Sequence, residues 1–165
     1  MEFPEFAAAR LPSLLRYAHL LTGDPHLAED LVQEALTRAY LNWSKVQRAE
    51  RPERYVVRIL TNHYLGWRRR SWWRRDLPAG DELASPSVPD SAADLVERDA
   101  VWALLATLPR RQRAVLVLRY YEGLTDAEIG ELLGCAPVTV RTHAFRAFAA
   151  LRERLAPATS EGGTA

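Results

Sequence analysis

The sequence predicts an all-α protein, built as two small helical domains joined by a flexible acidic linker. Apolar residues recur at the three- and four-residue spacing of helices, and no segment alternates with the two-residue period of a strand. Residues 77–91 combine prolines, serines, a glycine and acids without any period, which is typical of a linker. A chain of 165 residues is long enough for one medium domain or two small ones. We therefore expect domains at residues 1–75 and 93–157, a linker at 76–92 and a disordered tail at 158–165.

Three main helices are expected in the N-terminal domain, at about residues 4–21, 25–43 and 52–75. The Gly-Asp-Pro run at 23–25 ends the first helix and begins the second, because proline suits a first helical position. The first two helices each have an apolar stripe that we expect to be buried: Leu11, Leu14, Leu15, Ala18 and Leu21 in the first, and Leu27, Leu31, Val32, Ala35 and Ala39 in the second. The third contains Tyr55, Ile59 and aromatic residues from Tyr64 on.

The C-terminal domain is expected to contain helices at about 93–106 and 110–121, followed by a helix-turn-helix at 123–152. Thr125 and Glu128 have the spacing of a capping box, Gly134 suits the left-handed residue that ends a helix, and Pro137 suits the start of the next. A second helix of this kind enters the major groove of DNA. In this second helix the residues expected to be buried are Val140, Ala144, Ala147 and Leu151, with Phe148 on the flank. Those expected to point outward are Thr142, Phe145, Arg146 and Ala149.

Composition and charge restrict the class of partner. A single cysteine, Cys135, excludes an internal disulfide and fits the cytoplasm, and the four scattered histidines have no metal-ligand spacing. We expect neither a signal peptide nor a membrane span, since no basic region precedes an apolar stretch and no apolar run is long enough.

The net charge of +1 hides a segregation of charges along the chain. Residues 51–75 hold eight arginines against one acid, and residues 76–99 hold seven acids against one arginine. A basic block of this kind favours a polyanion.

Two clusters outside the helix-turn-helix suggest binding. Residues 67–75 read WRRRSWWRR, in which arginines can neutralise phosphates and exposed tryptophans can stack on bases, although at least one ring is expected in the core. On the second helix Asp30, Gln33, Glu34 and Thr37 share a polar face. No histidine or lysine completes a catalytic constellation around these carboxylates, so we expect no enzyme.

Taken together, these segments resemble a bacterial RNA polymerase sigma factor of the extracytoplasmic-function (ECF) group of the sigma-70 family, and most of all its small two-domain actinobacterial members. HLAEDLVQEALTRAY and RPERYVVRILTNHYLGWRRR resemble the sigma-2 domain, and residues 108–151 resemble the sigma-4 domain. The resemblance implies a promoter-specificity subunit that binds core RNA polymerase at the β′ clamp helices and the β flap. It implies promoter DNA as the second partner, allows an anti-sigma factor as a third, and requires no cofactor.

The resemblance also assigns site residues. Those expected to meet the β′ clamp helices are Asp30, Gln33 and Glu34. Those expected to read the minus-thirty-five element are Thr139, Arg141, Thr142, Phe145 and Arg146. Those expected to capture a flipped minus-ten base and hold the melted strand are Asn62, Trp67, Arg68, Arg69 and Arg70.

The sequence departs from the family pattern at two positions. Gly66 stands where many relatives have an acidic residue, and Ala136 stands where a serine usually caps the recognition helix. Both departures concern the detail of promoter reading. The acidic linker has two interpretations: Asp81, Glu82 and Asp90 mimic phosphates in a polymerase cleft, or they are a solvated tether.

Two other functional classes remain open at this stage. The run PVTVRTH also resembles the output domains of response regulators, which would make the chain a regulator that binds duplex DNA alone. Against this, the N-terminal half lacks the alternating β/α pattern of a receiver. The third class is an adaptor that binds polymerase without contacting DNA, which the outward Phe145 and Arg146 disfavour.

Overall fold

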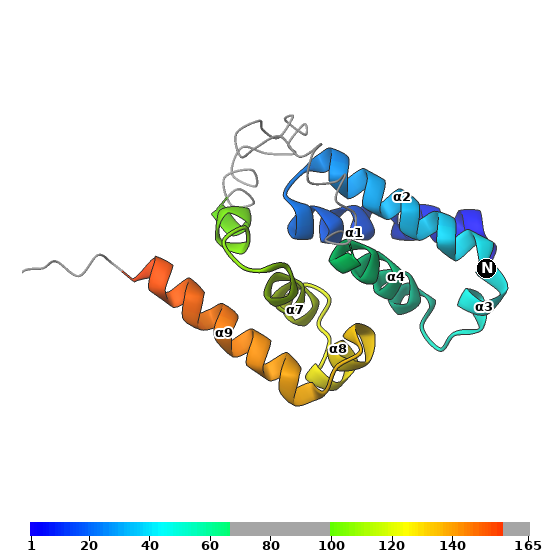
Figure 1. Cartoon of the computed structure of the whole chain (residues 1–165). Coiled ribbons are helices and arrows are strands. Elements are labelled where there is room, and N and C mark those ends of the chain that lie inside the picture. Colours follow the sequence, from blue (N-terminus) through cyan, green and yellow to red (C-terminus); the bar gives the residue numbers. More distant parts are fainter. Residues whose placement is uncertain (67–99, 157–165) are drawn as a thin grey trace, which may run out of the picture.

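A computed structural model describes residues 1–66 and 100–156, and every regular element within these ranges is a helix (Figure 1). The all-α fold class is therefore confirmed. A helical stretch at 100–105 opens the second described range. The remaining helices are α1 (Phe3–Thr22), α2 (Pro25–Leu41), α3 (Trp43–Arg48), α4 (Pro52–Gly66), α7 (Arg110–Tyr120), α8 (Asp126–Leu133) and α9 (Pro137–Leu155).

The Gly-Asp-Pro junction between α1 and α2 forms as the sequence predicts. Gly23 ends α1 in the left-handed region, at φ 71°, and its N–H donates to His19 O at 2.7 Å. The Asp24 carboxylate accepts from the backbone N–H of His26 at 2.7 Å and caps α2. This tight turn places α1 and α2 side by side, and α4 packs against both. Large side chains with no more than 1% exposure fill the space between them: Tyr17, Leu21, Leu31, Val32, Leu60 and Tyr64.

One polar pair lies inside this core. The Tyr17 hydroxyl and Thr61 Oγ1 are 2.6 Å apart, and Thr61 Oγ1 donates to Val57 O at 2.7 Å. Because the threonine hydroxyl has a single proton, Tyr17 is the donor in the pair. Burial raises the pKa of the Tyr17 phenol well above its ordinary value. The pair therefore joins α1 to α4 with neutral, satisfied groups.

Several stripe and boundary predictions need correction. Of the residues named for the third helix, Tyr64 is buried and Tyr55 and Ile59 are half-buried, while Val56, Val57, Leu60 and Thr61 complete the buried face of α4. Leu11 is 40% exposed. The residues Leu15, Leu27 and Leu151 are half-buried and pack on the edge of the core.

The second helix also ends earlier than predicted. The Asn42 side chain donates to Arg38 O at 3.0 Å and interrupts the helix, and Trp43 then begins the separate helix α3. There the Trp43 ring packs against Phe3 and Phe6 of α1, with ring centroids 5.5 and 5.1 Å apart.

The C-terminal half is organised around α7, whose residues 114–118 are all buried. Because these consecutive apolar residues span more than one helical turn, this stretch of α7 needs packing partners on all sides. α8 and α9 pack on one side of α7, while α1 and α4 pack on another (Figure 1). The two described halves of the chain are therefore in contact.

Candidate nucleic-acid and polymerase interfaces

The helix-turn-helix of α8 and α9 has the geometry that the sequence predicts. Thr125 Oγ1 accepts from the Glu128 N–H and Glu128 Oε1 accepts from the Thr125 N–H, both at 3.2 Å, which completes the capping box. Gly134 lies at φ 74°. A further glycine, which sequence reasoning missed, makes the turn possible: a Cβ on Gly130 would lie 2.5 Å from Cys135 O. A glycine inside a helix one turn before its C-cap was the available signal.

The recognition helix α9 has a buried face and an exposed face. Val140, Ala144 and Ala147 are buried, and the opposite face carries Phe145 at 72% and Val138 at 57% exposure. A phenylalanine side chain this exposed contributes little to the core of the domain. The residues predicted to read DNA, Thr139, Arg141, Thr142, Phe145 and Arg146, are all exposed and share the outer half of the helix.

Two polar details shape this exposed face. Thr142 Oγ1 donates to Val138 O at 3.0 Å, so the proton of this hydroxyl is used within the helix itself. His143 is half-buried beside it, and burial lowers the pKa of His143, which the positive charges of Arg111 and Arg146 lower further. The imidazole is therefore neutral at pH 7 and does not repel Arg146. At the start of the helix, Ala136 provides no side-chain cap, as its sequence predicts.

The polar face of α2 has the predicted composition and a further apolar end. Asp30 and Gln33 are exposed, and Glu34 Oε1 accepts from Arg38 Nε at 2.8 Å. About two turns beyond Gln33 and Glu34, Tyr40 is 62% and Leu41 73% exposed. Sequence reasoning missed these two apolar residues, although their spacing continues the same face. The face as a whole combines acids, an amide and an apolar end, which suits a protein partner.

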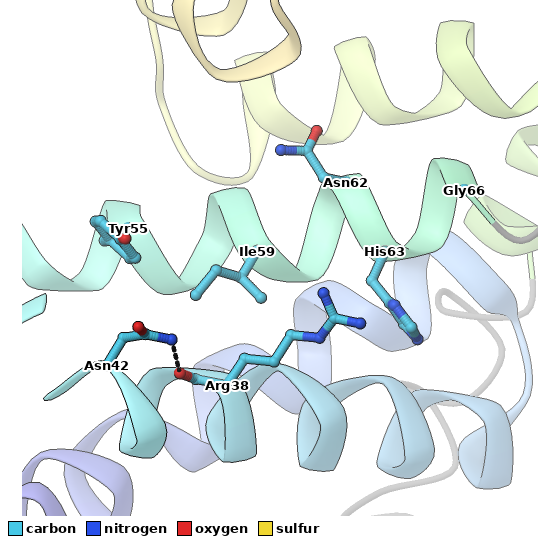
Figure 2. Close-up of a pocket in the computed structure, with 7 residues that line it drawn as sticks. All are labelled: Arg38, Asn42, Tyr55, Ile59, Asn62, His63 and Gly66. Carbon is cyan, nitrogen blue, oxygen red and sulfur yellow. Dashed lines mark hydrogen bonds between the residues drawn. The ribbon is translucent and has the colours of Figure 1, made fainter.

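A groove of about 610 Å³ separates α2 from α4, and Figure 2 shows its lining. Tyr55 and Ile59 provide apolar surface, and Arg38 extends across the groove toward His63. Asn62 is exposed on its rim and points away from α2. Sequence reasoning assigned Asn62 to a site and Gly66 to a departure from the family pattern, but it did not bring them together with the other residues that line the groove: Arg38, Asn42, Tyr55, Ile59 and His63.

Four predicted site residues lie outside the described residues: Trp67, Arg68, Arg69 and Arg70. They follow directly on Gly66, the last described residue of α4, at the end of the helix that carries Asn62 and the groove. Arg51, directly before α4, and Arg58 on α4 are exposed, so basic character extends along the described part of that helix.

The described residues contain neither a group of three His, Cys, Asp or Glu side chains placed to hold a metal ion nor a helix that is long and apolar enough to cross a membrane.

Comparison with known families gives two matches along the chain. The sigma-70 region 2 model matches residues 6–74, and the sigma-70 region 4 model matches residues 98–151. The two matched segments correspond in order to the helices around the groove and to the helix-turn-helix.

Individual proteins show the same similarity. The RNA polymerase sigma-E factor of Streptomyces avermitilis is 35% identical over 159 residues, covering 94% of this chain and 86% of its own length. The ECF RNA polymerase sigma factor SigL of Mycobacterium tuberculosis is 35% identical over 142 residues, covering 84% of this chain and 80% of its own length.

Among solved structures, the sigma factor RpoE of Bartonella quintana, crystallised with the anti-sigma factor NepR, has a TM-score of 0.72 at 24% identity and covers 93% of this chain and 96% of its own. The fold is thus shared with a sigma factor. With both regions present in order and identity extending over most of each relative, this chain belongs to the ECF group of the sigma-70 family and is a promoter-specificity subunit of bacterial RNA polymerase.

Proposed function

We propose a division of the promoter-specificity function among three surfaces of the chain. The face of α2 around Asp30, Gln33 and Glu34 binds the β′ clamp helices of core polymerase. The exposed face of α9 reads the minus-thirty-five element in the major groove, while the C-terminal domain also contacts the β flap. The end of α4 and residues 67–70 bind the minus-ten element and its melted strand.

The observation that carries this proposal is the exposed face of α9. Arg141 and Arg146 can each donate two hydrogen bonds to the edge of a guanine, and the Phe145 ring can contact a thymine methyl group. In a helical hairpin that served only the fold, a 72% exposed phenylalanine between two arginines would have no function. An adaptor that avoids DNA is therefore disfavoured.

The groove beside Asn62 supports the minus-ten assignment. An amide offers one acceptor and two donors, which match the edge of an unstacked base, and Tyr55 and Ile59 provide apolar surface nearby. Capturing a base offsets an unstacking cost of about a few kcal/mol per step. Strand opening by this route needs base and phosphate contacts alone, so we propose no catalytic residue and no cofactor.

We propose an anti-sigma factor as a further partner. The Bartonella quintana relative was crystallised with one, and the Sphingomonas sp. Fr1 protein PhyRSL, with a TM-score of 0.66 at 20% identity over 100% of this chain and 98% of its own, was solved in complex with NepR. The place of action that we propose is the cytoplasm, where the polymerase works and where a lone cysteine stays reduced.

Run-off transcription tests the proposed function. Purified core polymerase should produce a transcript from a cognate promoter only when this chain is added, and the chain alone should bind duplex DNA weakly. Tight, sequence-specific binding without polymerase would favour the alternative of an independent DNA-binding regulator. The proposal would be refuted if the holoenzyme produced no transcript from any of the promoters selected with it.

A further inference from the structure

The first turn of the recognition helix carries an exposed valine to which the promoter contacts described above give no role. We propose that Val138 contacts the methyl group of a thymine in the minus-thirty-five element, as a second apolar contact beside that of Phe145. The element then contains two thymine methyl groups no more than about three base pairs apart. The inference rests on the proposed function, because it specifies which bases the exposed face of α9 recognises.

Val138 lies on the same face of α9 as residues that we assign to DNA. Val138, Arg141, Thr142 and Phe145 stand at positions i, i+3, i+4 and i+7, the spacing of one helical stripe, and all four are exposed. Val138 is 57% exposed, while Val140, two residues on, is completely buried. The side chain of Val138 therefore contributes little to the core and belongs to the surface that meets the major groove.

The place of Val138 at the start of α9 favours contact with bases. It is the second residue of a helix that begins at Pro137, and recognition helices contact base edges through their N-terminal residues. A valine in a helix has one strongly preferred χ1 rotamer, so its two methyl groups hold a defined position. Little side-chain entropy is therefore lost when these methyl groups meet another apolar group.

The charges of α9 also fit a helix that enters a groove between phosphates. The sixteen residues 137–152 contain three arginines, Arg141, Arg146 and Arg152, and neither aspartate nor glutamate. Phosphates on both sides of the groove would repel a carboxylate on this helix, whereas they attract the arginines. The part of α9 that follows Val138 is therefore free of the charge that would oppose its approach to the bases.

Thymine is the base that suits an exposed valine. In the major groove thymine alone presents a methyl group, on its C5 atom. Valine has neither a donor nor an acceptor in its side chain, so it discriminates by apolar contact, and burial of one methyl group changes an affinity about fourfold. The neighbouring Thr142 hydroxyl donates to Val138 O at 3.0 Å and keeps only its acceptor sites, which match the amino group of adenine or cytosine. The two neighbours thus recognise different groups.

The two apolar side chains determine how far apart the thymines lie. Val138 and Phe145 are seven residues apart, which is about 10.5 Å along an α-helix. At roughly 3.4 Å per base pair this length corresponds to about three base pairs, and to fewer where the helix inclines to follow the groove. The contacts of Val138 and Phe145 therefore fall on thymines within that distance, on either strand.

Replacing thymine by deoxyuridine tests this contact, because it removes the methyl group and leaves the hydrogen-bonding groups of the base unchanged. Each thymine of the minus-thirty-five element, in a promoter selected with the holoenzyme, is replaced in turn, and fluorescence anisotropy measures binding of the holoenzyme. The parent protein is compared with Val138→Ala and Phe145→Ala. Val101→Ala is the matched control, since Val101 is also an exposed valine, at 46%, and lies outside the helix-turn-helix.

We expect the parent protein and Val101→Ala to lose about fourfold in affinity at each of two thymines. In Val138→Ala one of these thymines should become insensitive to the loss of its methyl group, and in Phe145→Ala the other. Helical circular dichroism of Val138→Ala should equal that of the parent, because alanine is the better helix former. A valine with a purely structural role would instead lower the affinity for every fragment alike.

Three results would overturn the inference. In the first, no thymine loses its sensitivity in Val138→Ala. In the second, the thymine coupled to Val138 lies more than about three base pairs from the one coupled to Phe145. In the third, the selected element has no two thymines at this spacing.

Run-off transcription separates a failure of this inference from a failure of the proposed function. Transcription that depends on the chain, without any coupling at Val138, would refute the thymine contact alone. Coupling at Val138 without a transcript from any selected promoter would refute the proposed function and leave the contact standing.

Discussion

Tyr17 and Thr61 form the buried polar pair between α1 and α4, and they depend on each other unequally. In Tyr17→Phe, Thr61 still donates to Val57 O, so the free energy of unfolding should fall by about 0.5–1.5 kcal/mol. In Thr61→Val, the Tyr17 hydroxyl loses its acceptor inside the core and the loss should be about 1–3 kcal/mol. Urea denaturation of both variants measures the difference. Equal losses would show that the pair is arranged differently.

Phe145 and Phe148 lie one turn apart on α9. Alanine substitutions at the two positions should have different effects, one on DNA binding and the other on the stability of the domain. Phe145 is 72% exposed, so Phe145→Ala should change the free energy of unfolding by less than about 0.5 kcal/mol. It should weaken holoenzyme binding to the minus-thirty-five element by about 1 kcal/mol, or fivefold.

The matched control for this variant is Phe148→Ala. Phe148 packs edge-on against Tyr120, with centroids 5.8 Å apart, so its removal should cost about 1–3 kcal/mol of stability. Thermal melting and a fluorescence-anisotropy titration of the holoenzyme measure both quantities. A large fall in melting temperature for Phe145→Ala would place that ring in the core.

Single residues also show where sequence reasoning succeeds and where it fails. The outward position of Phe145 was predictable because α9 has one buried face and water on the other. The buried face of α4 was not identified, since the sequence reading named only Tyr55, Ile59 and the aromatic residues from Tyr64 on, and the first two are half-buried. The residues Val56, Val57, Leu60, Thr61 and Tyr64 share one face at helical spacing, so the periodicity was present in the sequence.

At the scale of the element, the missing cap of α9 is a correctable weakness. Ala136 holds the N-cap position with an extended backbone but no side-chain acceptor. Ala136→Ser should stabilise the helix-turn-helix by about 1 kcal/mol, since a serine hydroxyl can accept a backbone N–H in the first turn of the helix. Chemical denaturation followed by circular dichroism tests this gain. Thr125→Ala, which removes the cap of α8, is the opposite control and should destabilise by a similar amount.

The polar face of α2 makes a prediction for assembly. Replacing Gln33 and Glu34 together by alanine should leave the helix intact, since alanine is the best helix former and neither side chain is in the core. Affinity for core polymerase should fall at least tenfold if this face meets the clamp helices. This affinity is measured by letting the double variant compete with the parent protein for core polymerase. A double variant that assembles normally would move the polymerase contact to another surface, such as that of Tyr40 and Leu41.

Helices whose ends are marked by capping residues or prolines were predictable from the sequence, and the short helix α3 was not. Caps and prolines at α1, α2, α8 and α9 mark their ends within about two residues. The helix α3 has only six residues, too few to be stable alone, and it forms because Trp43 packs on the two phenylalanines of α1. Tertiary contact, rather than local sequence, determines that element.

At the scale of the whole molecule, strand opening is the activity that separates a sigma factor from other helix-turn-helix proteins. Asn62→Ala should leave the closed promoter complex nearly unchanged, because one amide adds little to binding of duplex DNA. It should reduce the melted fraction and relax the preference at one minus-ten base. Permanganate footprinting with holoenzymes at matched occupancy measures the melted fraction. Melting equal to that of the parent protein would leave Asn62 as a polar residue of the groove rim.

The contact between the two halves was beyond prediction from the sequence. The order of the segments and their helical class follow from periodicity, caps and composition. Arg113, by contrast, donates to backbone carbonyls. Because every residue has a backbone carbonyl, no pattern of side chains predicts which ones Arg113 binds. The only local hint is that residues 114–118 are apolar without interruption, which requires α7 to be covered on several sides.

The way Arg113 is bound has a consequence for how the contact between the two halves responds to ionic strength. Its guanidinium is held by neutral carbonyls and a phenol at close range, which dissolved ions screen little, whereas contacts to DNA phosphates release counterions and weaken steeply as salt rises. We therefore expect the Arg113 part of the contact between α7 and residues 1–66 to persist at salt concentrations that weaken promoter binding.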